Sequence, residues 1–101
     1  MSASGTTTVD FGAFPGTTDA SVAITGQAAI VSGSLVGAWI RPVATADHSA
    51  DEHRVERIAI VADTIVAATG FTIYAREDGE ATVGNEGHRR WGLWTVAWAW
   101  T

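Results

Sequence analysis

Residues 93–100 read LWTVAWAW and are the part of the chain most informative about its fold. Every second side chain is large and apolar, in the order Trp94, Val96, Trp98 and Trp100. The residues between them are small: Thr95, Ala97 and Ala99. Strict alternation of this kind predicts a β-strand with one face in the core, and we expect this strand at residues 90–100. Because residues 91–101 contain no charge and no proline that would protect a free edge, we expect this strand to be central or covered.

Other stretches have the composition of short strands separated by turns. We expect strands at residues 6–10, 21–25, 28–31, 34–43, 71–76 and, beyond an Asp-Gly hairpin at residues 77–80, at residues 81–84. Pro42 marks a strand end because it has no N–H to donate. The series predicts an all-β fold, a small antiparallel β-sandwich or barrel of about seven or eight short strands.

Residues 55–68 fit two structures. Apolar residues at helical spacing, with Ser49 and Glu52 in the pattern of a capping box, indicate a helix. The abundance of Ile, Val and Thr indicates strands instead, interrupted at Asp63 and Thr64. We favour strands; the alternative is an α+β fold with a helix at about residues 50–69.

Length and composition limit the possible classes. A chain of 101 residues forms one domain, and we expect a flexible N-terminus at residues 1–5 followed by a single β domain at residues 6–101. The chain has no cysteine for disulfides or thiolate metal sites. It contains neither an apolar run of transmembrane length nor a signal-peptide pattern. The net charge of −5 and the absence of lysine argue against a nucleic-acid partner, and we expect no membrane partner.

The charges are unevenly distributed along the chain. Residues 1–46 carry only Asp10, Asp19 and Arg41, and residues 91–101 carry none. A small monomer normally covers its surface with charged groups. Two long stretches that lack them therefore predict surface in contact with another chain. We expect a homo-oligomer held by apolar contacts.

The densest polar segment is DHSADEH, residues 47–53, whose carboxylates and imidazoles are possible ligands for a divalent metal. Their spacing matches no zinc motif, and we favour a solvated loop or a single helical turn capped by Ser49. The chain contains no nucleophile elbow, phosphate loop or reactive cysteine. We therefore expect no enzyme: no catalytic residues, no cofactor and no metal.

Five tryptophans are many for a chain of this length. They form our set of interface or core aromatics: Trp39, Trp91, Trp94, Trp98 and Trp100. They could form one wall of the core, lie at a subunit interface, or stack on sugar rings. We favour the core, because an alternating strand is first of all a half-buried strand.

Three segments carry a resemblance to a known group of proteins: DHSADEH (47–53), GFTIYA (70–75) and LWTVAWAW (93–100). Together with the lysine-free chain and the strands rich in Thr, Ala, Gly and Val, they resemble small virion proteins of tailed bacteriophages and prophages. These are decoration or cement proteins of the head and small tail- or fibre-associated subunits. The resemblance implies β-structured subunits that assemble as symmetric oligomers on a virion, for which we expect a trimer because threefold sites recur in virion lattices. It carries over no functional residue.

These observations lead to one expected function and one alternative. We expect a non-enzymatic structural subunit of a phage virion, assembled in the host cytoplasm, that oligomerises and docks on a larger protein such as a capsid or tail subunit. Capsid decoration is favoured over a tail role. The alternative is a carbohydrate-binding or receptor-binding module that uses exposed tryptophans.

Overall fold

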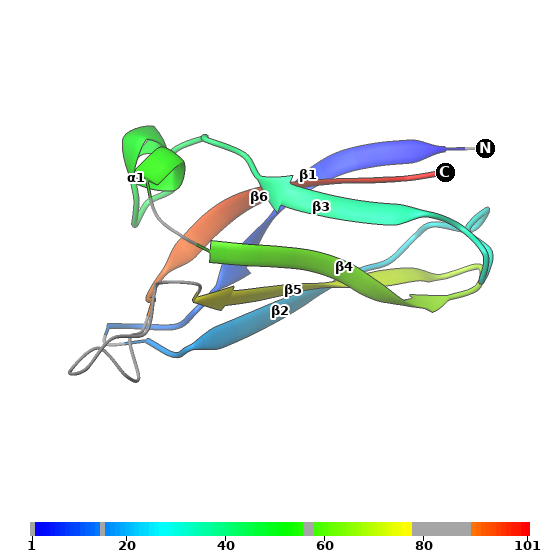
Figure 1. Ribbon diagram of the computed structural model, residues 1–101, viewed down its shortest axis with the longest axis horizontal. Helices are drawn as coiled ribbons and strands as arrows, with labels where there is room; N and C mark the ends of the chain where they lie inside the picture. Colours follow the sequence, from blue (N-terminus) through cyan, green and yellow to red (C-terminus); the bar gives the residue numbers. More distant parts are fainter. Residues whose placement is uncertain (1, 15, 56–57, 78–89) are drawn as a thin grey trace.

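The computed structural model describes residues 2–14, 16–55, 58–77 and 90–101. Six strands and one short helix lie in these ranges (Figure 1): β1 (Ala3–Asp10), β2 (Asp19–Ile24), β3 (Val36–Ile40), α1 (Ala50–Val55), β4 (Ile58–Val66), β5 (Gly70–Glu77) and β6 (Leu93–Trp100). No helix in this part of the chain is long and apolar enough to cross a membrane.

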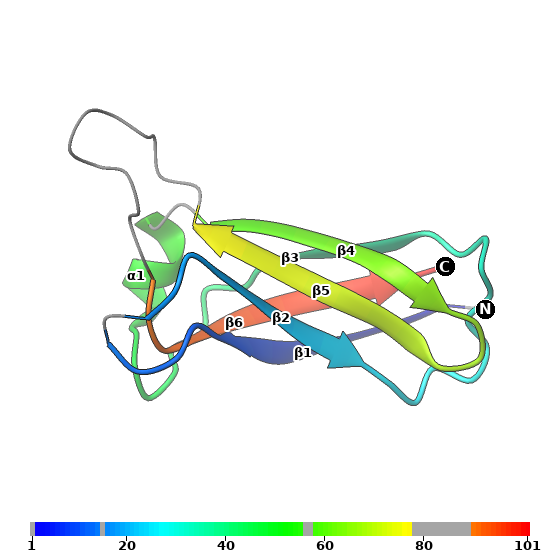
Figure 2. The ribbon, with the colours of Figure 1, turned by 90° about the horizontal axis from the view of Figure 1, so that it is seen from below.

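The strands form two antiparallel sheets, in the orders β1-β6-β3 and β2-β5-β4. Figures 1 and 2 show the sheets as two layers, with α1 at the end of the sandwich away from the two termini. The expected all-β sandwich is confirmed, but the number of strands in the described residues is six rather than seven or eight. The expected strand at residues 81–84 and most of its hairpin lie outside the described residues.

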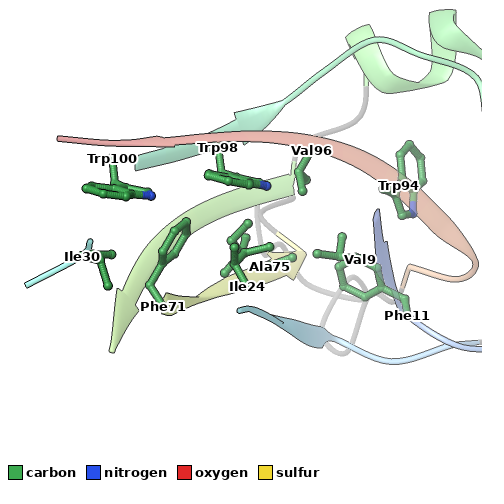
Figure 3. Packing of buried hydrophobic residues seen from close by; sticks show 11 residues of the cluster. Val9, Phe11, Ile24, Ile30, Phe71, Ala75, Trp94, Val96, Trp98 and Trp100 are labelled. Atoms are coloured by element: carbon green, nitrogen blue, oxygen red, sulfur yellow. The ribbon is translucent and has the colours of Figure 1, made fainter. Parts of the chain in front are cut away.

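Strand β6 lies between β1 and β3, so the prediction of a central last strand is confirmed. Its large side chains point into the core. Trp98 and Trp100 face Phe71, Ile24 and Ile30 from the opposite layer and its adjoining loop (Figure 3). Their indoles fill the space between the sheets, and burial of such large rings is a principal source of stability in a domain of this size.

The N-terminus departs from expectation. Residues 3–5 belong to β1 and pair with Trp100, Ala99 and Trp98 of β6 instead of forming a flexible end. The reason lies in the contact between Gly5 and Trp98. A Cβ on Gly5 would lie 2.7 Å from Cζ2 of that indole, so the ring occupies the place that a side chain would take.

Residues 28–31 do not form the expected strand. The chain turns there, with the N–H of Ile30 donating to the carbonyl oxygen of Gln27 at 3.1 Å. Ile30 is nevertheless buried in the core, and the side-chain oxygen of Gln27 accepts a 2.9 Å hydrogen bond from the indole Nε1 of Trp100. Ala28, Ala29 and Val31 are exposed, so Ile30 alone of these four residues enters the core, and the segment is a loop at one end of the sandwich.

The ambiguous segment resolves mainly into strand. The capping box forms, with Ser49 N donating to Glu52 Oε1 at 2.9 Å and Glu52 N donating to Ser49 Oγ at 3.2 Å. The helix it starts ends at Val55, and β4 follows, so the alternative of a helix reaching residue 69 is wrong. Strand β4 is irregular between Asp63 and Val66, where the sequence pattern is also interrupted.

Candidate functional site

The polar segment at residues 47–53 packs against the beginning of β6. Strand β3 ends before Pro42, so no strand pairs with β6 beyond that point on this side. The side chain of Asp47 lies where the next strand would continue, and its Oδ2 accepts a 2.8 Å hydrogen bond from Leu93 N. The hydroxyl of Thr45 donates to Leu93 O at 2.9 Å. Side chains therefore satisfy the backbone groups that a neighbouring strand would otherwise satisfy.

His53 continues this pairing from α1. Its Nε2 accepts a 3.0 Å hydrogen bond from Thr95 N, and its Nδ1 lies 2.7 Å from Ser49 O. A carbonyl oxygen can only accept and an amide N–H can only donate, so the ring is neutral with its hydrogen on Nδ1. The side chain is buried, and both of its nitrogens are engaged with the backbone.

His48 lies flat against Trp94, with ring centroids 3.8 Å apart and planes 19° from parallel. Its Nδ1 is 2.8 Å from Glu52 Oε2 and its Nε2 is 2.6 Å from Trp91 O. Both neighbours are acceptors, so a doubly protonated imidazole satisfies both. The pKa of Glu52 is lowered from its ordinary value, first by the hydrogen bond from Ser49 N and then by the bond to His48.

These contacts assign the polar segment a structural role. Asp47 and His53 complete the hydrogen bonding of β6, and His48 joins α1 to the aromatic core. Within the described ranges, no three His, Asp or Glu side chains come together in a group that could hold a metal ion. Asp47, His48 and His53, which were considered as possible metal ligands, instead form hydrogen bonds with backbone groups of the chain.

The five candidate tryptophans fall into three environments. Trp94, Trp98 and Trp100 are buried in the core. Trp91 is partly buried, in an edge-on contact with the exposed ring of Phe14. Trp39 is 52% exposed. The indoles of the last strand are therefore not available as a sugar platform, because Trp98 and Trp100 face the opposite sheet and its adjoining loop, and the ring of Trp94 is covered by His48 and His53.

Trp39 belongs to a flat surface on the outer side of the β1-β6-β3 sheet, which we call the open face. The registers set Thr6, Ala97 and Trp39 side by side across the three strands, and Ser4, Ala99 and Gly37 in the next row. Leu35 extends this face beyond the start of β3 and is 75% exposed. The eight residues of the open face are uncharged: Ser4, Thr6, Thr8, Leu35, Gly37, Trp39, Ala97 and Ala99. Ala97 at its centre is buried, and the charged Asp10 and Arg41 follow in the alternation of β1 and β3 at the margin of the face.

All residues of the open face come from the two charge-poor stretches of the sequence, residues 1–46 and 91–101. Strands β1 and β3 from the first stretch enclose β6 from the second, so one sheet collects both. The eight residues of the face include no acid or base that could transfer a proton or activate its hydroxyls. Its flat, apolar and hydroxyl-lined surface is suited to contact with another protein.

The outer side of the β2-β5-β4 sheet is different in character. A hollow of about 580 Å³ lies over this sheet. Its lining includes the side chains of Asp19, Ser21, Val61, Tyr74 and Arg76. The phenol oxygen of Tyr74 is 2.8 Å from Thr64 Oγ1, and the residue is 42% exposed. The candidate aromatics predicted from the sequence were the tryptophans and did not include Tyr74, which alternates with the buried Phe71 and Ile73 along β5 and lies on its outer side.

Comparisons of the chain with protein-family models, with curated proteins and with solved structures find no match.

Proposed function

We propose that this protein is a non-enzymatic structural subunit that oligomerises and docks on a larger protein assembly through its open face. The observation that carries the proposal is the composition of that face: no charged residue, with Trp39 half exposed and Leu35 three-quarters exposed. The solvent side of an antiparallel sheet is normally polar. An aromatic anchor surrounded by small residues is typical of the centre of a protein interface.

The size of the open face agrees with a docking role. Three strands at a spacing of about 4.8 Å and a length of about 25 Å give a surface of roughly 350 Å² in plan. The largest apolar patch on a typical monomer covers roughly 300–600 Å² and is often functional. Leu35 and Trp39 lie on the same strand side with only Gly37 between them, so both can enter one complementary surface.

The assembly we propose is a phage virion, with capsid decoration or cement favoured over a tail role. The support is the resemblance of residues 47–53, 70–75 and 93–100 to small virion proteins, together with the lysine-free composition. A β-sandwich of this size is compatible with such a subunit. The partners proposed are a second copy of the chain and a larger capsid or tail protein.

The test is mass spectrometry of purified phage particles from a host that carries the gene. We expect the chain in the particles in stoichiometric amounts. Trp39→Glu should remove it from them, because a charge on the open face must be desolvated on docking. Val61→Glu, equally exposed on the opposite sheet, is the matched control and should remain bound. Absence of the unmodified chain from particles contradicts the virion role, and loss of the Val61 variant alone contradicts the assigned face.

A second candidate function is carbohydrate binding, which the hollow over the β2-β5-β4 sheet favours. Tyr74 supplies an exposed aromatic ring, while Asp19, Ser21 and Arg76 supply groups that can hydrogen-bond to sugar hydroxyls. A glycan array tests this candidate. Binding that is lost in Tyr74→Ala and kept in Trp39→Ala would favour it over docking, whereas no binding to any glycan contradicts it.

A further inference from the structure

The inference concerns β1, which forms one edge of the β1-β6-β3 sheet. Its eight residues pair with β6 in a single unbroken register. Proteins usually protect such edges with charges, proline or bulges. The edge strand β4 has an irregularity at Asp63–Val66, and β3 is short and followed by Arg41 and Pro42. Strand β1 has none of these devices before Asp10.

The hydrogen-bonding groups of β1 divide into two sets. On β6, backbone groups of Thr95 and Thr101 form hydrogen bonds with Arg41 and Leu35 on the β3 side. Because the direction of the N–H and C=O groups alternates along a strand, those of the even-numbered residues of β6 point toward β1. These pair with the odd-numbered residues of β1, in agreement with the bond from Phe11 N to Gly92 O. The N–H and C=O groups of Ser4, Thr6 and Thr8 therefore point away from the sheet, where the described part of the chain supplies no further strand.

We propose that this edge pairs with β1 of a second copy of the chain, antiparallel and about a twofold axis at Thr6. The two sheets then join into one continuous six-stranded sheet. This inference deepens the oligomerisation in the proposed function, and it replaces the expected threefold contact with a twofold one.

The register follows from the strand itself. A twofold axis at Thr6 pairs Thr6 with the same residue of the second copy, and Ser4 with Thr8. Each such pair exchanges two backbone hydrogen bonds, and Thr–Thr and Thr–Ser neighbours are favourable across strands. Both copies keep their large core side chains on the same side. A shift by two residues in either direction shortens the overlap within residues 2–10.

The strand is self-complementary about Thr6, and its lack of local charge allows a second copy of the chain as the occupant. The chain has a net charge of −5, so two copies repel each other unless their contact surfaces are neutral. Residues 2–9 are uncharged. In the proposed register Asp10 lies opposite Ser2, and the two Asp10 carboxylates are separated by roughly 25 Å. This is more than twice the screening length at about 0.1 M salt, so no like-charge pair opposes the contact.

Single-cysteine variants test the pairing directly, because the chain has no native cysteine. Directly opposed residues of a hydrogen-bonded pair have Cα atoms about 5.5 Å apart, within disulfide range. Under mild oxidation we expect Thr6→Cys to form a covalent dimer. The matched control is Ser21→Cys, exposed on the edge strand β2 of the other sheet, which should remain monomeric.

The register has its own test. Ser4→Cys and Thr8→Cys should each fail to cross-link alone, because the equivalent residues are about 13 Å apart across the axis. A mixture of the two variants should give the mixed disulfide. Cross-linking of Thr6→Cys no faster than the control, or self-linking of the Ser4 and Thr8 variants in place of the mixed product, overturns the proposal.

Association without cross-linking is measured by light scattering over a wide concentration range. One strand edge buries less than the roughly 800 Å² per partner of a standard interface, so we expect dissociation in the micromolar range or weaker. Thr6→Lys places two cations opposite each other and should weaken the dimer at least about tenfold, whereas Thr6→Val should retain it. A monomer up to about 1 mM overturns the pairing. If the dimer forms but the unmodified chain does not dock on particles through Trp39, this result contradicts the proposed function and leaves the β1 pairing standing.

Discussion

At the scale of single residues, Asp47 and His53 replace a neighbouring strand at the beginning of β6. Each satisfies one backbone N–H of β6, of Leu93 and Thr95 respectively. A buried N–H without a partner is unfavourable, so these side chains allow β6 to extend past the end of β3. Polar residues that suggested a ligand site in the sequence therefore act on the chain's own backbone.

His53→Ala tests this role. The substitution leaves Thr95 N–H without its acceptor in a buried position, and we expect the free energy of unfolding to fall by about 1–3 kcal/mol. Arg54→Ala is the control: Arg54 lies on the same helix, is exposed, and among the described residues pairs with the exposed Asp51, so its change should stay within about 0.5 kcal/mol. Urea denaturation of both variants measures the difference, and equal stability would contradict the role.

The lowered pKa of Glu52 should make the free energy of unfolding depend on pH. Its pKa is lowered in the folded chain by the hydrogen bonds from Ser49 and His48, so the folded state binds its proton less readily than the unfolded state. The resulting stabilisation is present above the ordinary pKa of 4.5 and is lost as the pH falls through the lower, folded-state value. Thermal unfolding from pH 7 to pH 2 should show a gap between the unmodified chain and Glu52→Gln that closes in acid. A gap that stays constant with pH would contradict this assignment.

At the scale of elements, the sequence predicted that a segment is a strand better than it predicted which strands lie beside it. The alternation of residues 93–100 identified β6 as a strand with a buried face, because a period of two depends only on local geometry. It did not reveal that β1 and β3 flank β6, since the partners of β1 lie most of the chain away in the sequence and those of β3 more than half of it away. The prediction of a strand at residues 28–31 failed for a different reason. Ile30 is buried, as an apolar side chain favours, but an apolar residue can be buried in a loop as well as in a strand.

Gly5 gives a test of the packing between β1 and β6. Alanine usually suits a strand better than glycine. Here its Cβ would lie 2.7 Å from Cζ2 of Trp98, a ring fixed in the core, so the indole or the strand must move. We expect Gly5→Ala to lower the free energy of unfolding by about 1–3 kcal/mol. Ser4→Ala, directed to the exposed face of the same strand, should be nearly neutral; equal effects would contradict the packing.

At the scale of the whole molecule, the uneven charge distribution becomes a difference between the two outer faces. Residues without charge in the sequence form the open face, while the opposite sheet carries Asp19, Asp63 and Arg76 outward. Composition alone indicated that uncharged surface exists, but not that it gathers on one sheet. The hollow at Tyr74 was not predictable either, because it depends on how residues of three paired strands come together.

This asymmetry predicts how association should respond to salt. The β1 edge and the open face are uncharged, so contacts made there contain no ion pairs that screening would weaken. The remaining electrostatic effect is repulsion between two chains of net charge −5, and screening reduces it. Light scattering at micromolar to millimolar protein, in about 0.05 M and about 1 M sodium chloride, should therefore show equal or tighter association at high salt, where the screening length falls to about 3 Å. Dissociation of the oligomer at high salt would show that charged groups outside the open face and β1 hold the copies together.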